Sequence, residues 1–180
     1  GDWSSDVCSS DLFGIVYGIG AFSLAKDIGV SNKEAKHYIE SYLAHYSGVD
    51  SYMKNVVEKA NADGYVETMF GRRRNLPELT SSKHMIRAFG ERVARNMPIQ
   101  GTAADIIKIA MIKVDERMKA ENLRARLVLQ VHDELIVEAP QDESMRVALI
   151  VQEEMENAVK MSVPLTADAA IGRTWYDAKG

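Results

Sequence analysis

The sequence predicts an α+β fold that is mostly helical and contains one antiparallel β-hairpin. Three observations support this prediction. Apolar residues recur at three- and four-residue spacing over several long stretches, two of these stretches begin with capping-box signatures, and two short apolar runs flank the polar triplet His132-Asp133-Glu134. At 180 residues, the chain is long enough to form one globular domain or a piece of a larger one.

Residues 1–12 differ in composition from the rest of the chain. The segment GDWSSDVCSSDL contains four Ser and three Asp, holds the only cysteine and shows no helical or strand period. One interpretation is a disordered leader. Reverse translation of Asp2 to Asp11 also gives GAC TGG AGT TCA GAC GTG TGC TCT TCC GAT, which resembles a common sequencing-library adapter. We therefore expect residues 1–12 to be non-native and the native sequence to start at Phe13.

The composition argues against a disulfide framework and against a membrane span. A single cysteine cannot form a disulfide within the chain. The longest apolar runs are well short of the roughly 18 residues that a bilayer-spanning helix needs, and the N-terminus has no basic region followed by an apolar stretch. We expect a soluble, cytoplasmic protein with no membrane partner.

Two helices are predicted in the first third of the chain. The capping box Ser31 to Glu34 starts the first helix, whose apolar residues recur at helical spacing through position 46. Gly48 interrupts the pattern. A second apolar face then runs from Val49 to Ala60, and Asp63-Gly64 is a typical helix stop.

A strand and a basic turn are predicted next. Tyr65 to Phe70 is rich in β-forming residues and leads into the basic run at 71–75. This strand-and-turn segment is followed by a helix expected from Lys83 to Met97.

Pro98 and Gly101 predict a break in that helix, because proline lacks the N–H that helix hydrogen bonding needs and glycine is a weak helix former. A second capping box, Thr102 to Asp105, then predicts a new helix that runs to about Glu121.

The last third of the chain predicts the β-hairpin and a further helix. Apolar residues at 127–131 and 135–137 indicate two buried strands around the polar tip. A helix is expected from Asp142 to Met161, and a strand is expected near Leu165 to Ile171.

Charge is segregated along the chain, whose formal net charge is −4. Between Arg72 and Arg95, seven basic residues face two acidic ones, a local net of +5. Between Asp133 and Lys160, eight acidic residues face two basic ones, a local net of −6. A basic face and an acidic tip suit a protein that binds a phosphate backbone and a metal cation. A solvated charged surface is the alternative interpretation.

Asp133 and Glu134 are the candidate metal ligands. Carboxylates next to an apolar core are costly unless they are paired or bound to a metal. Their hard oxygen atoms are the kind of ligand that suits Mg²⁺. Because neighbouring side chains on a strand point to opposite faces, we favour Asp133 as the direct ligand and Glu134 as the weaker or indirect one. His132 either contacts a phosphate or caps the turn, and the whole triplet is also compatible with an ordinary hairpin tip.

Arg92, Asn96 and Gln100 are spaced at four-residue intervals and form one stripe if the helix persists through Met97. Such donors suit the minor groove of a duplex, where base pairs of every sequence offer acceptors. The stripe would then recognise pairing geometry without reading sequence. A solvent-exposed polar face is the alternative.

Phe13 and Tyr17 lie one helical turn apart in FGIVYG. Aromatic pairs on helices usually belong to a core, but they also serve as platforms on which bases stack.

Four segments, in this order, resemble the C-terminal end of the family A DNA polymerases of the bacterial DNA polymerase I type: FGIVYG, GYVETMFGRRR, ERVARNMPIQGTAADIIK and LQVHDELIVEA. The resemblance covers residues 13–180. In that family, FGIVYG matches the end of motif B on a fingers helix, and VHDE matches motif C in the palm. The resemblance therefore implies a fingers portion at 13–82 and a palm portion at 83–180 that carries the HDE hairpin.

The resemblance also implies roles for the candidate residues. The duplex near the primer terminus would be contacted by the helical stripe of Arg92, Asn96 and Gln100 and by Arg72 and Arg73 of the basic turn. The incoming nucleotide would be contacted by Phe13, Tyr17 and His132. Catalysis and metal binding would depend on Asp133 and Glu134.

This sequence departs from the family pattern at two places. Motif B of the family has Arg and Lys upstream of its aromatic residue, where this chain has Ser5 and Ser9. Motif A, which carries the other metal-binding Asp of the family, has no counterpart here. One of the two expected Mg²⁺ sites therefore lacks its carboxylate.

The implied function is template-directed DNA synthesis with two Mg²⁺ ions, primer-template DNA and dNTPs, by a complete enzyme expected to be a monomer in the bacterial cytoplasm. The 180-residue chain is expected to be inactive alone. The alternative is a non-catalytic module that binds duplex DNA.

Overall fold

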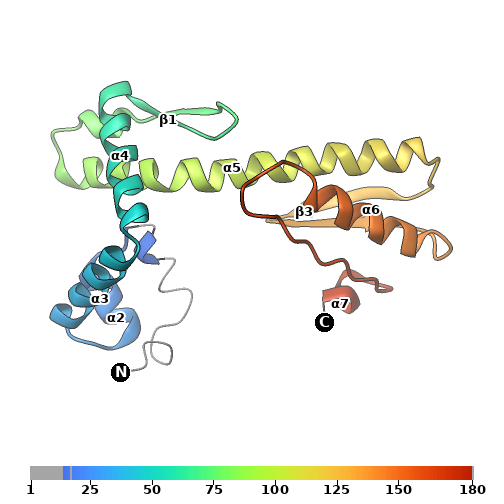
Figure 1. Ribbon diagram of the computed structural model, residues 1–180, viewed down its shortest axis with the longest axis horizontal. Helices are drawn as coiled ribbons and strands as arrows, with labels where there is room; N and C mark the ends of the chain where they lie inside the picture. The colour runs from blue at the N-terminus through green and yellow to red at the C-terminus, as the bar shows by residue number, and fades with distance from the viewer. Residues whose placement is uncertain (1–13, 17, 180) are drawn as a thin grey trace. The chain divides into compact units, whose positions relative to one another are not determined.

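The computed structural model describes residues 14–16 and 18–179, and it confirms the α+β class. The expectations for residues 1–12, Phe13 and Tyr17 lie outside these residues. The elements in chain order (Figure 1) are α2 (Ala21–Ile28), α3 (Asn32–His45), α4 (Ser47–Asp63), β1 (Tyr65–Glu67), β2 (Arg73–Asn75), the 3-10 helix η1 (Pro77–Thr80), α5 (His84–Ala120), β3 (Arg126–Val131), β4 (Glu134–Glu138), α6 (Ser144–Glu156) and α7 (Trp175–Lys179).

Hydrogen bonds and backbone angles within a few residues fix ends of the helices before β1. The predicted capping box is confirmed: the Glu34 amide donates to the Ser31 hydroxyl at 3.3 Å, and the Ser31 amide donates to the Glu34 carboxylate at 3.0 Å. The side-chain hydrogen bond from Ser31 lowers the pKa of Glu34. The interruption falls at Tyr46, and Gly48 lies inside α4. Gly64 ends α4 in the left-handed region at φ 76°, as the sequence predicts.

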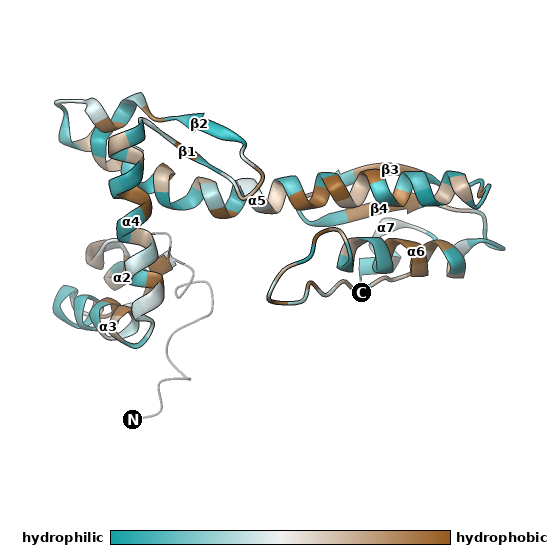
Figure 2. Ribbon diagram, turned by 45° about the horizontal axis from the view of Figure 1, so that its top comes forward, coloured by the Kyte–Doolittle hydropathy of each residue, from teal (hydrophilic) through white to brown (hydrophobic). Residues whose placement is uncertain are grey.

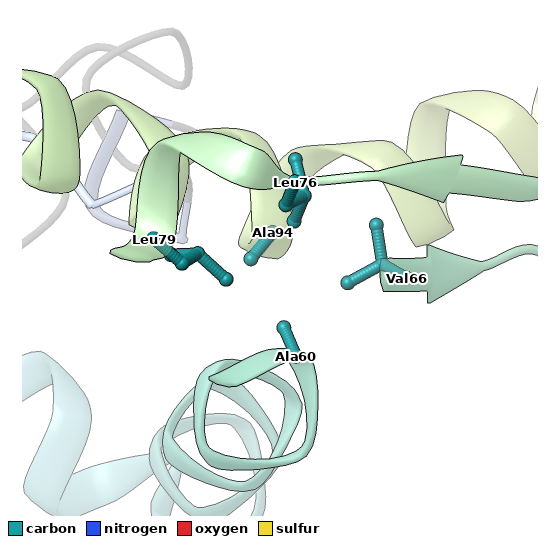
Figure 3. Close-up of a cluster of buried hydrophobic side chains, with 5 residues drawn as sticks. All are labelled: Ala60, Val66, Leu76, Leu79 and Ala94. Atoms are coloured by element: carbon teal, nitrogen blue, oxygen red, sulfur yellow. The ribbon is translucent and has the colours of Figure 1, made fainter. Parts of the chain in front are cut away.

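The chain divides into two compact units, with the division after Gly101. The expected boundary between fingers and palm at 82/83 stays a prediction. In the first unit, α2 and α3 share one core, and a second core joins α4, the β1–β2 pair, η1 and α5. Figure 3 shows the buried side chains of the second core: Ala60, Val66, Leu76, Leu79 and Ala94.

The expected helix break at Pro98 is wrong, because α5 is one helix of 37 residues with Pro98 inside it. A proline removes one N–H from the helix, so its direct cost is a single lost hydrogen bond plus local crowding. Pro98 and Ala94 are both buried, and packing of this kind offsets that cost. The Thr102 to Asp105 spacing therefore does not start a helix here, and both residues are buried along α5.

The second unit packs α6 and the C-terminal part of α5 against the hairpin. Val114 and Met118 on α5, with Val147 and Ile150 on α6, form its buried core. Leu135 of β4 packs against this core. The hairpin that carries the HDE triplet is thus supported from one side by two helices.

An ion-pair network links the same two helices. Arg117 on α5 pairs with Glu153 at 2.7 Å and with Glu154 at 2.8 Å on α6. Arg146 on α6 donates to Glu121 at 2.6 Å. The bond from Arg146 is the main cause that lowers the pKa of Glu121, and the bond from Glu154 is the main cause that raises the pKa of Arg117.

The predicted hairpin is confirmed as β3 and β4, which pair antiparallel with an irregularity between Leu127 and Leu129. The expectation of two buried strands is wrong: Val128 is 60% exposed and Leu129 is 48% exposed. Helices α5 and α6 pack against the side of this pair that carries Leu127, Leu135 and Val137.

The strand expected near Leu165 to Ile171 is wrong, since these residues form no regular element. A strand needs a partner edge for its backbone groups, and none pairs with this segment among the described residues. Among the helices of the described residues, none is long and apolar enough to cross a bilayer.

Candidate functional site

The predicted basic turn is a two-stranded ribbon, residues 65–75, which we call the basic ribbon. Glu67 on β1 pairs with Arg73 on β2, so part of the predicted turn is a strand. The actual turn lies at Thr68 to Gly71, where the Gly71 amide donates to the Thr68 carbonyl at 3.0 Å and Gly71 has φ 77°. Figure 2 shows that β2 is hydrophilic.

The arginines of the basic ribbon are not equivalent. Arg73 donates from Nε to Glu67 at 3.2 Å, and its guanidinium lies 4.4 Å from the centre of the Tyr65 ring. The Arg74 side chain is exposed and makes no hydrogen bond or ion pair among the described residues. Arg72 is exposed as well. Arg74 is therefore a better candidate for a phosphate contact than Arg73, and only its position in the basic run hinted at this.

The predicted stripe exists because α5 is continuous through Pro98. Arg92 and Gln100 are exposed, while Asn96 is half-buried between them. The side-chain oxygen of Asn96 is buried and has no hydrogen-bond partner in the described part of the chain. The Arg92 guanidinium lies 5.9 Å from the centre of the Phe89 ring. An unsatisfied buried amide oxygen is costly, and a nearby partner group would relieve this cost.

The ribbon and the stripe belong to the same unit and meet at α5. Val66 of β1 and Ala94 of α5 share one buried core. At the turn of the ribbon, Thr68 lies against Gly101, the residue after Gln100. The structure therefore brings the predicted DNA contacts of residues 72–100 together on one packed scaffold.

The HDE triplet forms the tip of the β3–β4 hairpin. Val131 pairs with Glu134, so His132 and Asp133 are the two loop residues. His132 has φ 53°, in the left-handed region that histidine visits more readily than β-branched residues. The Gln130 side-chain amide donates to the His132 carbonyl and supports this turn.

The two carboxylates of the tip have different surroundings. Glu134 forms an ion pair with Lys179 of α7 at 3.6 Å. Asp133 is exposed and makes no hydrogen bond or ion pair among the described residues, so its carboxylate is available to a ligand. This contrast agrees with the preference for Asp133 as the direct metal ligand.

The donor chemistry of the tip fits a hard cation such as Mg²⁺, because both side chains offer carboxylate oxygens. No cluster of three or more His, Cys, Asp or Glu side chains that could hold a metal occurs in the described residues. The tip therefore presents two carboxylates, fewer than the three such side chains of a cluster of that kind.

Comparison with known proteins identifies close relatives. The family described as DNA polymerase family A matches residues 10–177. The chain is 54% identical over 167 residues to DNA polymerase I of Bacillus caldotenax and 52% identical over 167 residues to DNA polymerase I of Bacillus subtilis, and it covers 19% of each. Each alignment covers 93% of this chain, which spans about a fifth of the length of these relatives.

A solved structure shares the fold. It is described as the POL domain of Pol1 from M. smegmatis in complex with DNA primer-template and dNTP. The TM-score is 0.91 at 45% sequence identity, and the match covers 95% of this chain and 30% of that chain.

Proposed function

Because the chain belongs to DNA polymerase family A, we propose that it supplies fingers residues (13–82) and palm residues (83–180) to a polymerase that extends a primer on a DNA template. In this reaction the primer 3′-hydroxyl oxygen bonds to the α-phosphorus of a dNTP, and pyrophosphate leaves as its bridging bond breaks. The complete enzyme would act as a monomer in the bacterial cytoplasm, at the nucleoid.

The observation that carries the proposal is the Asp133 carboxylate, which has no partner among the described residues and lies at the tip of a hairpin that two helices support. We assign Asp133 the role of direct Mg²⁺ ligand, with Glu134 beside it. A cation held there would lower the pKa of the attacking hydroxyl and stabilise negative charge on the phosphate. The hairpin core holds the carboxylate in place before substrate arrives, which is the main requirement for electrostatic catalysis.

The other predicted residues would bind substrates. We assign Arg72 and Arg74 to the phosphate backbone, and the stripe of Arg92, Asn96 and Gln100 to the duplex near the primer terminus. Arg73 would contribute less, since Glu67 already holds its guanidinium. Phosphate contacts set affinity and register, whereas the amide and guanidinium donors of the stripe sense base-pair geometry. Phe13, Tyr17 and His132 remain proposed nucleotide contacts.

A non-catalytic DNA-binding module is the second candidate. It is favoured by the position of the whole basic ribbon and stripe in a single compact unit that does not contain the HDE tip. Such a module would bind duplex DNA without Mg²⁺, and in it Asp133 would have no role.

Binding of the chain to a short blunt duplex is expected to weaken steeply as salt rises. The double variant Arg72→Gln/Arg74→Gln should make the slope of the logarithm of the binding constant against the logarithm of salt concentration shallower by about two. The reason is that each lost phosphate contact reduces the steepness of this slope by about one. Fluorescence anisotropy over a salt series measures this slope. The matched control, Arg124→Gln/Arg126→Gln, removes the same charge from arginines that pair with Glu143 and Glu138, and its slope should stay unchanged. Equal slopes for the two double variants would contradict the assignment.

The purified 180-residue chain is expected to give no template-directed incorporation, even where it binds DNA. The reason is that two carboxylates provide only part of a two-metal site, and catalysis by positioning fails when one part is absent. Extension of a labelled primer, with a complete bacterial relative as positive control, measures this. Incorporation that disappears in the Asp133→Ala variant would refute the expectation.

A further inference from the structure

We infer that Gly101 is a positioning residue for the basic ribbon, because the missing side chain lets Thr68 pack directly against α5. The inference rests on the proposed contact between the ribbon and DNA. It adds to that proposal a residue that itself touches neither DNA nor nucleotide.

The approach of the ribbon to α5 is too close for any larger residue. A Cβ atom at Gly101 would lie 2.7 Å from Cγ2 of Thr68. Carbon atoms pack best at about 3.5–4.0 Å. The next neighbour, Cε of Met97, would lie at an ordinary 3.5 Å. Among the described residues, the Thr68 methyl group is therefore the one that an added Cβ would overlap.

Thr68 cannot easily turn its methyl group away. Its hydroxyl accepts hydrogen bonds from the amides of Phe70 and Arg72, both at 3.2 Å. Its own amide donates to the Arg72 carbonyl at 2.9 Å. The residue is only 4% exposed. Rotation about χ1 would move the hydroxyl away from both donors, so an added Cβ at position 101 would push the turn of the ribbon away from the helix.

The displacement would act on the basic end of the ribbon. Val66 is anchored in the core with Ala94, so the start of β1 would stay in place. The turn that Thr68 organises leads directly into Arg72, whose amide and carbonyl both bond to Thr68. We therefore expect Gly101→Ala to shift the arginines at 72–74 relative to the stripe while the core remains packed.

The chain offers a matched control and a matched rescue. Gly48 is also helical, and a Cβ there would meet nothing within 4 Å. The rescue is Thr68→Ser, which removes the obstructing methyl group but keeps the hydroxyl that accepts from Phe70 and Arg72. The opposite variant, Thr68→Val, keeps a methyl group at this place and removes the hydroxyl.

The test measures DNA binding and turn structure separately in the 180-residue chain. Anisotropy over a salt series gives the slope for a short blunt duplex, and NMR hydrogen exchange without DNA reports protection of the Phe70 and Arg72 amides. Gly101→Ala should make the slope shallower by about one and reduce the protection of both amides. The double variant Gly101→Ala/Thr68→Ser should restore both readouts, whereas Gly101→Ala/Thr68→Val should restore neither. Gly48→Ala should change neither.

Several outcomes would overturn the inference. These are an unchanged exchange pattern in Gly101→Ala, a loss that Thr68→Ser does not rescue, and unfolding that persists in the rescued variant. Failure of the proposed function looks different: the unaltered chain would show no salt-dependent DNA binding, or the Arg72→Gln/Arg74→Gln variant would keep the full slope. The exchange data would then still decide whether Gly101 positions the ribbon.

Discussion

Asp133→Ala is expected to reduce primer extension by more than about 10³-fold in a chimera in which residues 13–177 of this chain replace the matching segment of a bacterial relative. The variant removes the one carboxylate of the tip that has no partner among the described residues. Single-turnover extension measures the chemical step directly. The affinity for primer-template should stay the same or rise slightly, because the substitution removes a negative charge near a phosphate backbone.

Two further variants test whether the charge of Asp133 is what matters and whether the effect is specific to this position. Asp133→Asn keeps the volume of the side chain but loses the negative charge, and it should be almost as inactive as Asp133→Ala. Asp142→Asn makes the same chemical change at an exposed carboxylate that pairs with Arg124, and it should extend primers normally. Extension by Asp133→Asn at a rate near that of the parent chimera would remove Asp133 from the metal site.

Ile150→Ala should lower the free energy of unfolding of the chain by about 2–5 kcal/mol, since it opens a cavity in the core beneath the HDE hairpin. Ile150 is fully buried on α6, next to Val114 and Val147. Urea denaturation followed by far-UV circular dichroism gives the midpoint and the slope. In the chimera, the same cavity should lower extension at temperatures below global unfolding, because it loosens the support of Asp133.

The adjacent residue provides the control. Leu149 is 44% exposed on the same helix, so Leu149→Ala removes a side chain of equal carbon number from the surface. Its cost should be within about 0.5 kcal/mol, the usual range for surface substitutions. Ile150→Val should fall between the two, at about 0.5–1.5 kcal/mol. Equal destabilisation by Leu149→Ala and Ile150→Ala would show that Ile150 has no special place in this core.

Local signals in the sequence were sufficient for several elements. The Ser31 capping box and the Gly64 stop depend on hydrogen bonds and backbone angles within a few residues, and both occur as predicted. The hairpin was predictable because its two apolar runs flank a short polar tip. The family was also predictable, since four ordered segments carry the resemblance and residues 10–177 match.

Other elements depended on contacts that no local pattern contains. Pro98 has a poor helix propensity, yet α5 continues through it because both Pro98 and Ala94 are buried by packing. Residues 165–171 have no partner edge among the described residues, so they form no strand. The difference between Arg73 and Arg74 likewise follows from a cross-strand neighbour, Glu67.

The sequence by itself determined the α+β class and the family, and it predicted candidate metal ligands and DNA contacts, because these follow from residue type, spacing and order. Only the tertiary structure decided that α5 is continuous and that the ribbon rests on α5 at Gly101. It also decided that Glu134 pairs with Lys179 while Asp133 has no partner in the part of the chain that the structure describes. The physical reason is that burial and pairing are properties of residues distant in the chain. A pattern along the chain records propensities, and packing between elements decides which of them prevail.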